Sequence, residues 1–104
     1  MAQFDVYANP SKSATQGIPY VVVMQSDLLE SLATRMTIPL ASMEFADKAP
    51  DKLCPIVMLN GQRLRALAHY AAPLPTCSLR QIMGNLTPQA SLLIAAMDVV
   101  ISGV

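Results

Sequence analysis

A chain of 104 residues is long enough for one domain with a single hydrophobic core, and at this size a second subunit would add to its stability. Seven basic and seven acidic side chains give a net charge of zero. The longest basic grouping is the spaced pair Arg63 and Arg65, which argues against direct binding of nucleic acid by this chain alone. Because 53% of the residues are hydrophobic and only 13% are charged, part of the apolar surface is expected to contact a partner.

The amino terminus and the cysteines indicate the compartment. MAQFDVYANP lacks the basic start and apolar run of a signal peptide, so a cytoplasmic protein is expected. The nearly apolar residues 92–101 are far fewer than the ~20 that span a bilayer, and Asp98 interrupts them, so no membrane association is expected. Cys54 and Cys77 have no CxxC spacing and are predicted to be small buried residues, rather than a disulfide or a metal site.

The first quarter of the chain predicts two strands. Residues 3–7, QFDVY, alternate between apolar and polar side chains, which is typical of a half-buried strand. Residues 8–17 gather Asn, Pro, Ser, Thr and Gly and predict a loop. The β-branched residues within 18–25, IPYVVVMQ, predict a strand covered on both faces. In residues 26–31, SDLLES, the spacing of a capping box predicts one or two helical turns.

The middle of the chain predicts an interrupted strand and a hairpin. Residues 35–42, RMTIPLAS, alternate like a strand, but Pro39 removes one backbone donor, so we expect an edge strand or a bulge. The polar residues 45–54 predict a loop. Asn60-Gly61 between two alternating runs predicts a type I′ hairpin turn. Residues 71–76, AAPLPT, should be extended, as an edge strand or a bend.

The last quarter predicts one helix. Residues 77–86 contain short apolar pairs and a Gly-Asn break, and no element is assigned to them. Thr87 as N-cap and Pro88 at the first position predict a helix that runs to about Ile101. This helix is apolar almost all round, so one face should meet the sheet and the other a second copy or a different protein. Asp98 lies near the helix C-terminus, where the dipole disfavours an anion by ~0.3 to 1 kcal/mol, so we expect a polar partner or a functional role for it.

Candidate catalytic residues are few. His69 is the single histidine, and an imidazole bonded to backbone at a strand end is favoured over a catalytic base. The sequence has no GxSxG, HExxH, phosphate-loop or paired-carboxylate motif, so no enzymatic activity, metal or cofactor is expected. Six of the seven methionines are expected to fill gaps in the core rather than to form an adaptable binding surface: Met24, Met36, Met43, Met58, Met83 and Met97.

Six segments, in order and spacing, resemble the CcdB family of plasmid and chromosomal toxins over almost the whole chain: QFDVY, VVVMQSDLL, RMTIPLAS, LCPIVMLNGQ, AAPLP and the terminal SGV. QSDLL and RMTIPLAS are the most specific of them. The resemblance implies a mainly β fold with a C-terminal α-helix, a small, partly open SH3-like barrel of the CcdB, MazF and Kid type. It further implies a single domain over residues 1–104 that forms a homodimer.

The same resemblance implies a toxin of a type II toxin–antitoxin module. Such a toxin binds the DNA gyrase A subunit and traps the complex with cleaved DNA, so that religation fails. A cognate antitoxin with a disordered tail neutralises it. Toxin and antitoxin together repress their operon, so operator DNA is contacted only through the antitoxin complex.

The resemblance places the gyrase-binding residues at the carboxyl end. Where the family typically has Trp-Gly-Ile, this chain has Ser102, Gly103 and Val104. An indole would bury on the order of 150 to 250 Å², whereas a serine hydroxyl offers a hydrogen bond and little area. Either the affinity for gyrase is weaker, or the contact is rebuilt with other residues such as Asp98 and Ile101, or the target has changed. The residues that bind the antitoxin are not identified.

Two other functions stay open. Toxins of the similar MazF fold are ribonucleases, for which Arg35, His69 and Arg80 are the candidate residues here, although no acid and base pair is evident. Alternatively, the replacement of the family Trp by Ser102 favours an inactive relative that retains only antitoxin binding. Purified protein incubated with total RNA would separate the first of these from gyrase poisoning.

Overall fold

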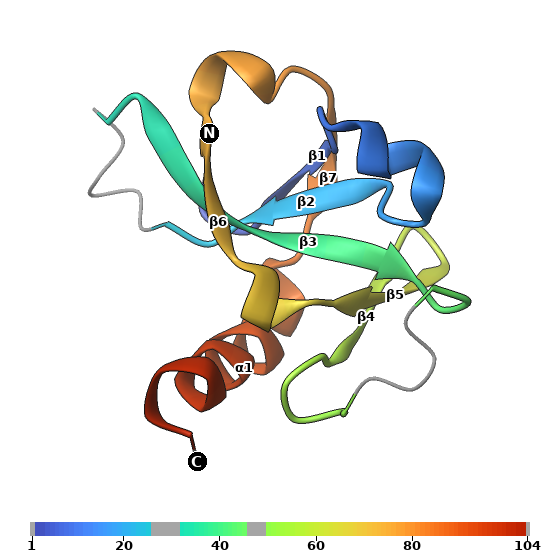
Figure 1. Ribbon diagram of the computed structural model, residues 1–104, viewed down its shortest axis with the longest axis vertical. Helices are drawn as coiled ribbons and strands as arrows, with labels where there is room; N and C mark the ends of the chain where they lie inside the picture. Colours follow the sequence, from blue (N-terminus) through green and yellow to red (C-terminus); the bar gives the residue numbers. More distant parts are fainter. Residues whose placement is uncertain (1, 26–31, 46–49, 104) are drawn as a thin grey trace.

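The computed structural model describes residues 2–25, 32–45 and 50–103, which form one antiparallel sheet and a C-terminal helix (Figure 1). In the described part of the chain the strands are β1 (Asp5–Ala8), β2 (Tyr20–Val23), β3 (Thr34–Ser42), β4 (Ile56–Leu59), β5 (Gln62–Ala66), β6 (Ala72–Pro75) and β7 (Ile82–Asn85). They are followed by helix α1 (Ala90–Ser102). The strand order is β4-β5-β3-β2-β1-β7, with β6 also paired to β3. The sheet curves into a half-barrel, which confirms the expected mainly β fold with a C-terminal helix.

β3 is the central strand, not an edge. It pairs with β2 on one side, while on the other side residues 40–42 pair with β5 and residues 34–37 pair with β6. The Pro39 carbonyl accepts a hydrogen bond from the Leu67 amide at 2.9 Å, on the side where β5 has ended and β6 has not begun. Because the amide and the carbonyl of one strand residue face the same side, the missing donor of Pro39 falls in this gap. The expectation of an edge or a bulge at Pro39 was wrong because one strand here has two successive neighbours.

The β4–β5 hairpin was predicted correctly, and its turn also helps to close the barrel. Asn60 has φ 51° and Gly61 φ 83°, the positive values of a type I′ turn. Asn60 Nδ2 donates to the Met83 carbonyl of β7 at 3.0 Å. A Cβ at Gly84 would lie 2.8 Å from Leu59 Cδ1. The two ends of the strand order therefore approach each other at this turn.

α1 covers one face of the sheet and completes the main core. The helix contributes the fully buried Leu93 and Ala96. The buried side chains of this cluster are Phe4, Val6, Val22, Ile38, Leu40, Val57, Leu59, Leu64, Ala66, Ala68, Leu86, Leu93 and Ala96. On the opposite face Val21 and Val23 belong to a smaller cluster with Tyr7 and Leu79. β2 is thus covered on both faces, as its β-branched residues predict.

The last quarter of the chain departs from the prediction before the helix. β7 pairs with β1 although residues 77–86 show no strand pattern. Thr87 is not the N-cap: its amide donates to Asn85 Oδ1 at 2.8 Å, and a 3-10 turn, η5 (Thr87–Gln89), precedes α1. The helix ends at Ser102, one residue beyond the expected position.

The remaining expectations concern the cysteines, the methionines, a helical turn and a membrane span. Cys54 is buried as predicted, but Cys77 is exposed. Met36 and Met58 are also exposed, whereas Met24, Met83 and Met97 pack against the core. The helical turn expected at residues 26–31 lies outside the described residues. No helix in the described ranges has the length and apolar character needed to cross a bilayer.

Candidate partner-binding site

The carboxyl end of α1 exposes apolar side chains. Figure 1 shows the helix at one end of the molecule, with its last turn projecting beyond the strands. Only Leu93 and Ala96 of the helix are fully covered, while Leu92, Ile94 and Val100 are between 41% and 48% exposed. Ile101 is 78% exposed. The all-round apolar pattern thus becomes a helix with one covered stripe and a large uncovered surface, which is typical of a partner-binding face.

The last turn brings four of the five predicted site residues together. Ser102 Oγ donates to the Asp98 carbonyl at 2.6 Å. Gly103 is in the left-handed conformation, φ 73°, and its amide donates to the Val99 carbonyl at 2.8 Å, as at many helix C-termini. Asp98, Ile101, Ser102 and Gly103 are all exposed. The fifth predicted residue, Val104, lies outside the described residues.

Ser102 acts within the helix rather than as a free donor. Its hydroxyl hydrogen is used in the bond to the carbonyl four residues before it, a common local interaction of serine in helices. The side chain can therefore only accept a hydrogen bond from a partner. In the described part of the last turn, the large exposed apolar side chains are Val100 and Ile101.

The Asp98 carboxylate makes no ion pair or hydrogen bond within the described ranges. Its exposure lets water solvate the charge. No polar partner for Asp98 is thus found inside the described part of the chain. Of the two expectations for this residue, a functional role is the one that remains.

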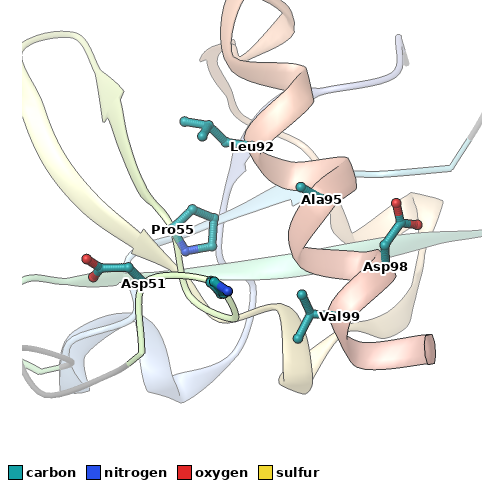
Figure 2. Close-up of a pocket in the computed structure, with 7 residues that line it drawn as sticks. Asp51, Pro55, Leu92, Ala95, Asp98 and Val99 are labelled. Atoms are coloured by element: carbon teal, nitrogen blue, oxygen red, sulfur yellow. The ribbon is translucent and has the colours of Figure 1, made fainter. Parts of the chain in front are cut away.

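A groove runs along the other side of α1 (Figure 2). It has a volume of about 390 Å³ and is lined by Asp51, Lys52, Pro55, Leu92, Ala95, Asp98 and Val99. Figure 2 shows Leu92, Ala95 and Val99 on the helix side, with Pro55 and Asp51 on the opposite wall. The Asp98 carboxylate is turned away from Pro55. The groove therefore has a mostly apolar floor, and it leads to the exposed last turn of the helix.

A buried arginine holds the wall opposite the helix. Arg65 Nη1 donates to Asp51 Oδ1 at 2.6 Å and to the Cys54 carbonyl at 2.8 Å. The Arg65 side chain is only 7% exposed. Sequence reasoning placed residues 45–54 in a loop and missed this wall, since no local pattern links it to Arg65.

The candidate catalytic residues contact different segments. His69 lies in a 3-10 turn, η3 (Ala68–Tyr70), and its Nδ1 lies 3.6 Å from Cys54 Sγ, so the expected bond to backbone was wrong. Arg35 is buried and donates to the Leu32 and Thr34 carbonyls. Arg80 Nε donates to the Cys77 carbonyl at 3.1 Å.

These contacts do not form a reactive centre. Burial raises the pKa of the Cys54 thiol, and the nearby Arg65 charge opposes this only partly, so the thiol is not poised as a nucleophile. In the residues that the structure describes, no group of three or more His, Cys, Asp or Glu side chains could hold a metal ion.

The class of this protein is thus a small half-barrel of antiparallel strands with a C-terminal helix. The helix covers the half-barrel, and its last turn is exposed. The chain matches the family model described as CcdB protein over residues 3–103, nearly its whole length. It therefore belongs to the CcdB family, and it is a toxin of the toxin–antitoxin type. A comparison with curated proteins gives no significant match.

Proposed function

We propose that this toxin acts as a homodimer that binds the A subunit of DNA gyrase through the last turn of α1 and holds the enzyme on cleaved DNA. The family match over residues 3–103 supports a toxin. The observation that carries the site is the exposure of Ile101, 78%, at the end of an apolar helix. A side chain of this kind contributes to binding when a partner removes it from water.

The binding residues in this proposal are Asp98, Ile101, Ser102, Gly103 and Val104. The described apolar area comes from Val100 and Ile101, and Gly103 permits close approach of a partner backbone. In a twofold dimer the two ends would present one symmetric patch, which suits a symmetric target such as a dimer of gyrase A subunits. The loss of the family Trp at position 102 should weaken the contact rather than remove it.

The remaining parts of the proposal concern regulation. A cognate antitoxin neutralises the toxin in the cytoplasm, and the two together repress their operon. Zero net charge and the absence of a long basic run support contact with operator DNA only through that complex.

A gyrase supercoiling and cleavage assay tests the proposal. Wild-type protein should inhibit supercoiling and increase cleaved DNA, whereas a chain lacking residues 102–104 should do neither. The control is Ile82→Lys, which changes an exposed apolar residue of β7 and should retain activity. Equal activity with and without the tail would overturn the site. No effect of the wild-type protein on gyrase would overturn the proposed function and favour an inactive relative.

A further inference from the structure

Gln89 connects the start of α1 to the free edge of the sheet. Its Nε2 donates to the Met58 carbonyl at 2.8 Å, and its Oε1 accepts from the Met58 amide at 2.8 Å. β4 is the first strand in the order, and among the strands that the structure describes it pairs only with β5. Since Met58 uses both backbone groups on Gln89, the side-chain amide takes the place of a neighbouring strand.

These two hydrogen bonds are directional, whereas the other contacts of the helix are not. α1 packs on the sheet through Leu93, Ala96 and Met97. Over the described ranges, residues 90–103 donate or accept no hydrogen bond with a strand. Hydrophobic packing favours burial without specifying one position of a helix along a surface. The two hydrogen bonds of Gln89 fix the position of the helix at its first turn.

The same two hydrogen bonds join both walls of the groove. One wall is α1, which follows Gln89 directly. The other wall, residues 51–55, leads directly into β4, whose third residue is Met58. Arg65 holds that second wall against the sheet. The spacing between the walls therefore depends on the bond between Gln89 and Met58.

We propose that Gln89 is a positioning residue: its amide sets the spacing between α1 and residues 51–55, and thereby the shape that the groove and the last turn present to the partner. This inference rests on the proposed function for its consequence in binding. The effect of Gln89 on the spacing does not depend on the proposed function, so the spacing and the binding can be tested separately.

The spacing is tested by pulsed electron paramagnetic resonance. Spin labels are attached at Lys52→Cys and Ser91→Cys, both exposed positions, in a Cys77→Ser background, where the buried Cys54 stays unlabelled. Labelled protein is diluted with unlabelled protein so that distances within one chain are measured. Gln89→Met, similar in size but unable to form either bond, should broaden the distance distribution. Gln62→Met, the same change at an exposed glutamine of β5, should leave it narrow.

Binding to a purified gyrase A fragment is then measured by calorimetry with unlabelled variants. Gln89→Met should weaken binding about tenfold, because a partner must first reorder the helix. Gln89→Glu keeps the acceptor for the Met58 amide but loses the donor, so an intermediate loss is expected, and this variant also serves if Gln89→Met fails to fold.

The outcomes separate the two proposals. If the distance distribution stays narrow in both Gln89 variants, the positioning role is overturned, whatever the binding measurement with gyrase A gives. Broadening without any change in affinity would also overturn it, because the spacing would not matter to the partner. If the wild-type protein does not bind gyrase A, the proposed function falls, and the distance distribution alone decides whether Gln89 positions the helix.

Discussion

At the residue scale, Arg65 is a buried charged side chain that fixes one wall of the groove. Its guanidinium is buried, and its Nε is the buried side-chain nitrogen without a hydrogen-bond partner among the described residues. Two acceptors on one short segment, the Asp51 carboxylate and the Cys54 carbonyl, compensate the charge. Because a buried charge that loses its partner is costly, this segment is tied to the sheet by electrostatics and not only by packing.

Asp51→Ala should lower the free energy of unfolding by about 1 kcal/mol, since Arg65 would keep only the Cys54 carbonyl. The estimate is small because the Asp51 side chain is 81% exposed and water screens the pair. Urea unfolding measures the change. Lys52→Ala, at the exposed neighbouring position, is the control and should have little effect. Equal stability of both variants would show that the pair contributes nothing.

Alkaline pH should destabilise the protein through two buried groups. Burial raises the pKa of the Cys54 thiol, and burial together with the Asp5 charge raises the pKa of the Tyr7 phenol. Both groups favour folding in their protonated forms. Their contribution is therefore complete below the pKa of the unfolded chain, about 8.5 for Cys and about 10 for Tyr, and is lost as pH rises through the folded pKa.

Urea unfolding between about pH 8 and about pH 10 checks this dependence. The Cys54→Ala variant should lose less stability over the lower part of this range than the wild-type protein, because the thiol is gone and the Tyr7 contribution is complete below about pH 10. Cys77→Ala is the matched control, since Cys77 is exposed. If Cys54→Ala followed the wild-type curve in slope, the thiol would not be the titrating group.

At the element scale, α1 serves two purposes that divide along its length. Its first turns bury Leu93 and Ala96 in the core, and its end exposes Ile101. Gly103 stops the helix in a left-handed conformation, and Ser102 bonds back to the Asp98 carbonyl. The helix thus ends at a defined point, with its apolar end outside the core.

Ile101→Lys should leave stability within about 0.5 kcal/mol of wild type, because the side chain is 78% exposed. The same change should abolish binding to a gyrase A fragment, since a charge would be placed in the apolar contact. Calorimetric unfolding and titration measure the two effects. Ile82→Lys, on β7, should be neutral in both, and loss of binding there as well would point to another surface.

At the scale of the whole molecule, three sheet edges are closed by three different devices. Gln89 takes up the Met58 edge of β4, and Asn60 bonds the Met83 carbonyl of β7. Directly after β6 the Thr76 amide donates to the carbonyl of Ala33, the residue before β3, so in β6 the alternate residues Pro73 and Pro75 face outward and offer no donor. A second copy is therefore expected to associate through side chains, in keeping with the proposed homodimer, and not by adding a strand.

Light scattering at micromolar concentration should give the wild-type protein twice the mass of one chain. The double variant Pro73→Ala, Pro75→Ala restores two outward amides on β6 and should form larger species by strand pairing. Pro10→Ala, in the exposed loop before η1 (Lys12–Gln16), is the control. A wild-type monomer would contradict the homodimer, and an unchanged mass of the double variant would contradict the protection of β6.

The predictions that were correct rest on local patterns. The strands in residues 3–7 and 35–42, the Asn60-Gly61 turn and the terminal helix depend on neighbours within a few positions, so they can be read along the chain. The faces of these strands were not predicted correctly, because Asp5, Arg35 and Thr37 are buried and Met36 is exposed. The family resemblance was likewise available, since it rests on ordered segments, and the family match confirms it. The exposed position of Ile101 also follows from a helix that is apolar almost all round.

The sequence by itself determined most of the elements, their approximate ends and the family of this protein, because backbone propensity and side-chain periodicity act over short separations. Only the tertiary structure decided that Pro39 lies in a central strand, that β7 forms, and that Arg65 and Gln89 hold the two sides of the groove. Each of these depends on which strands share an edge and which polar groups meet across it. Such pairings join residues far apart in the chain, and no local pattern specifies them.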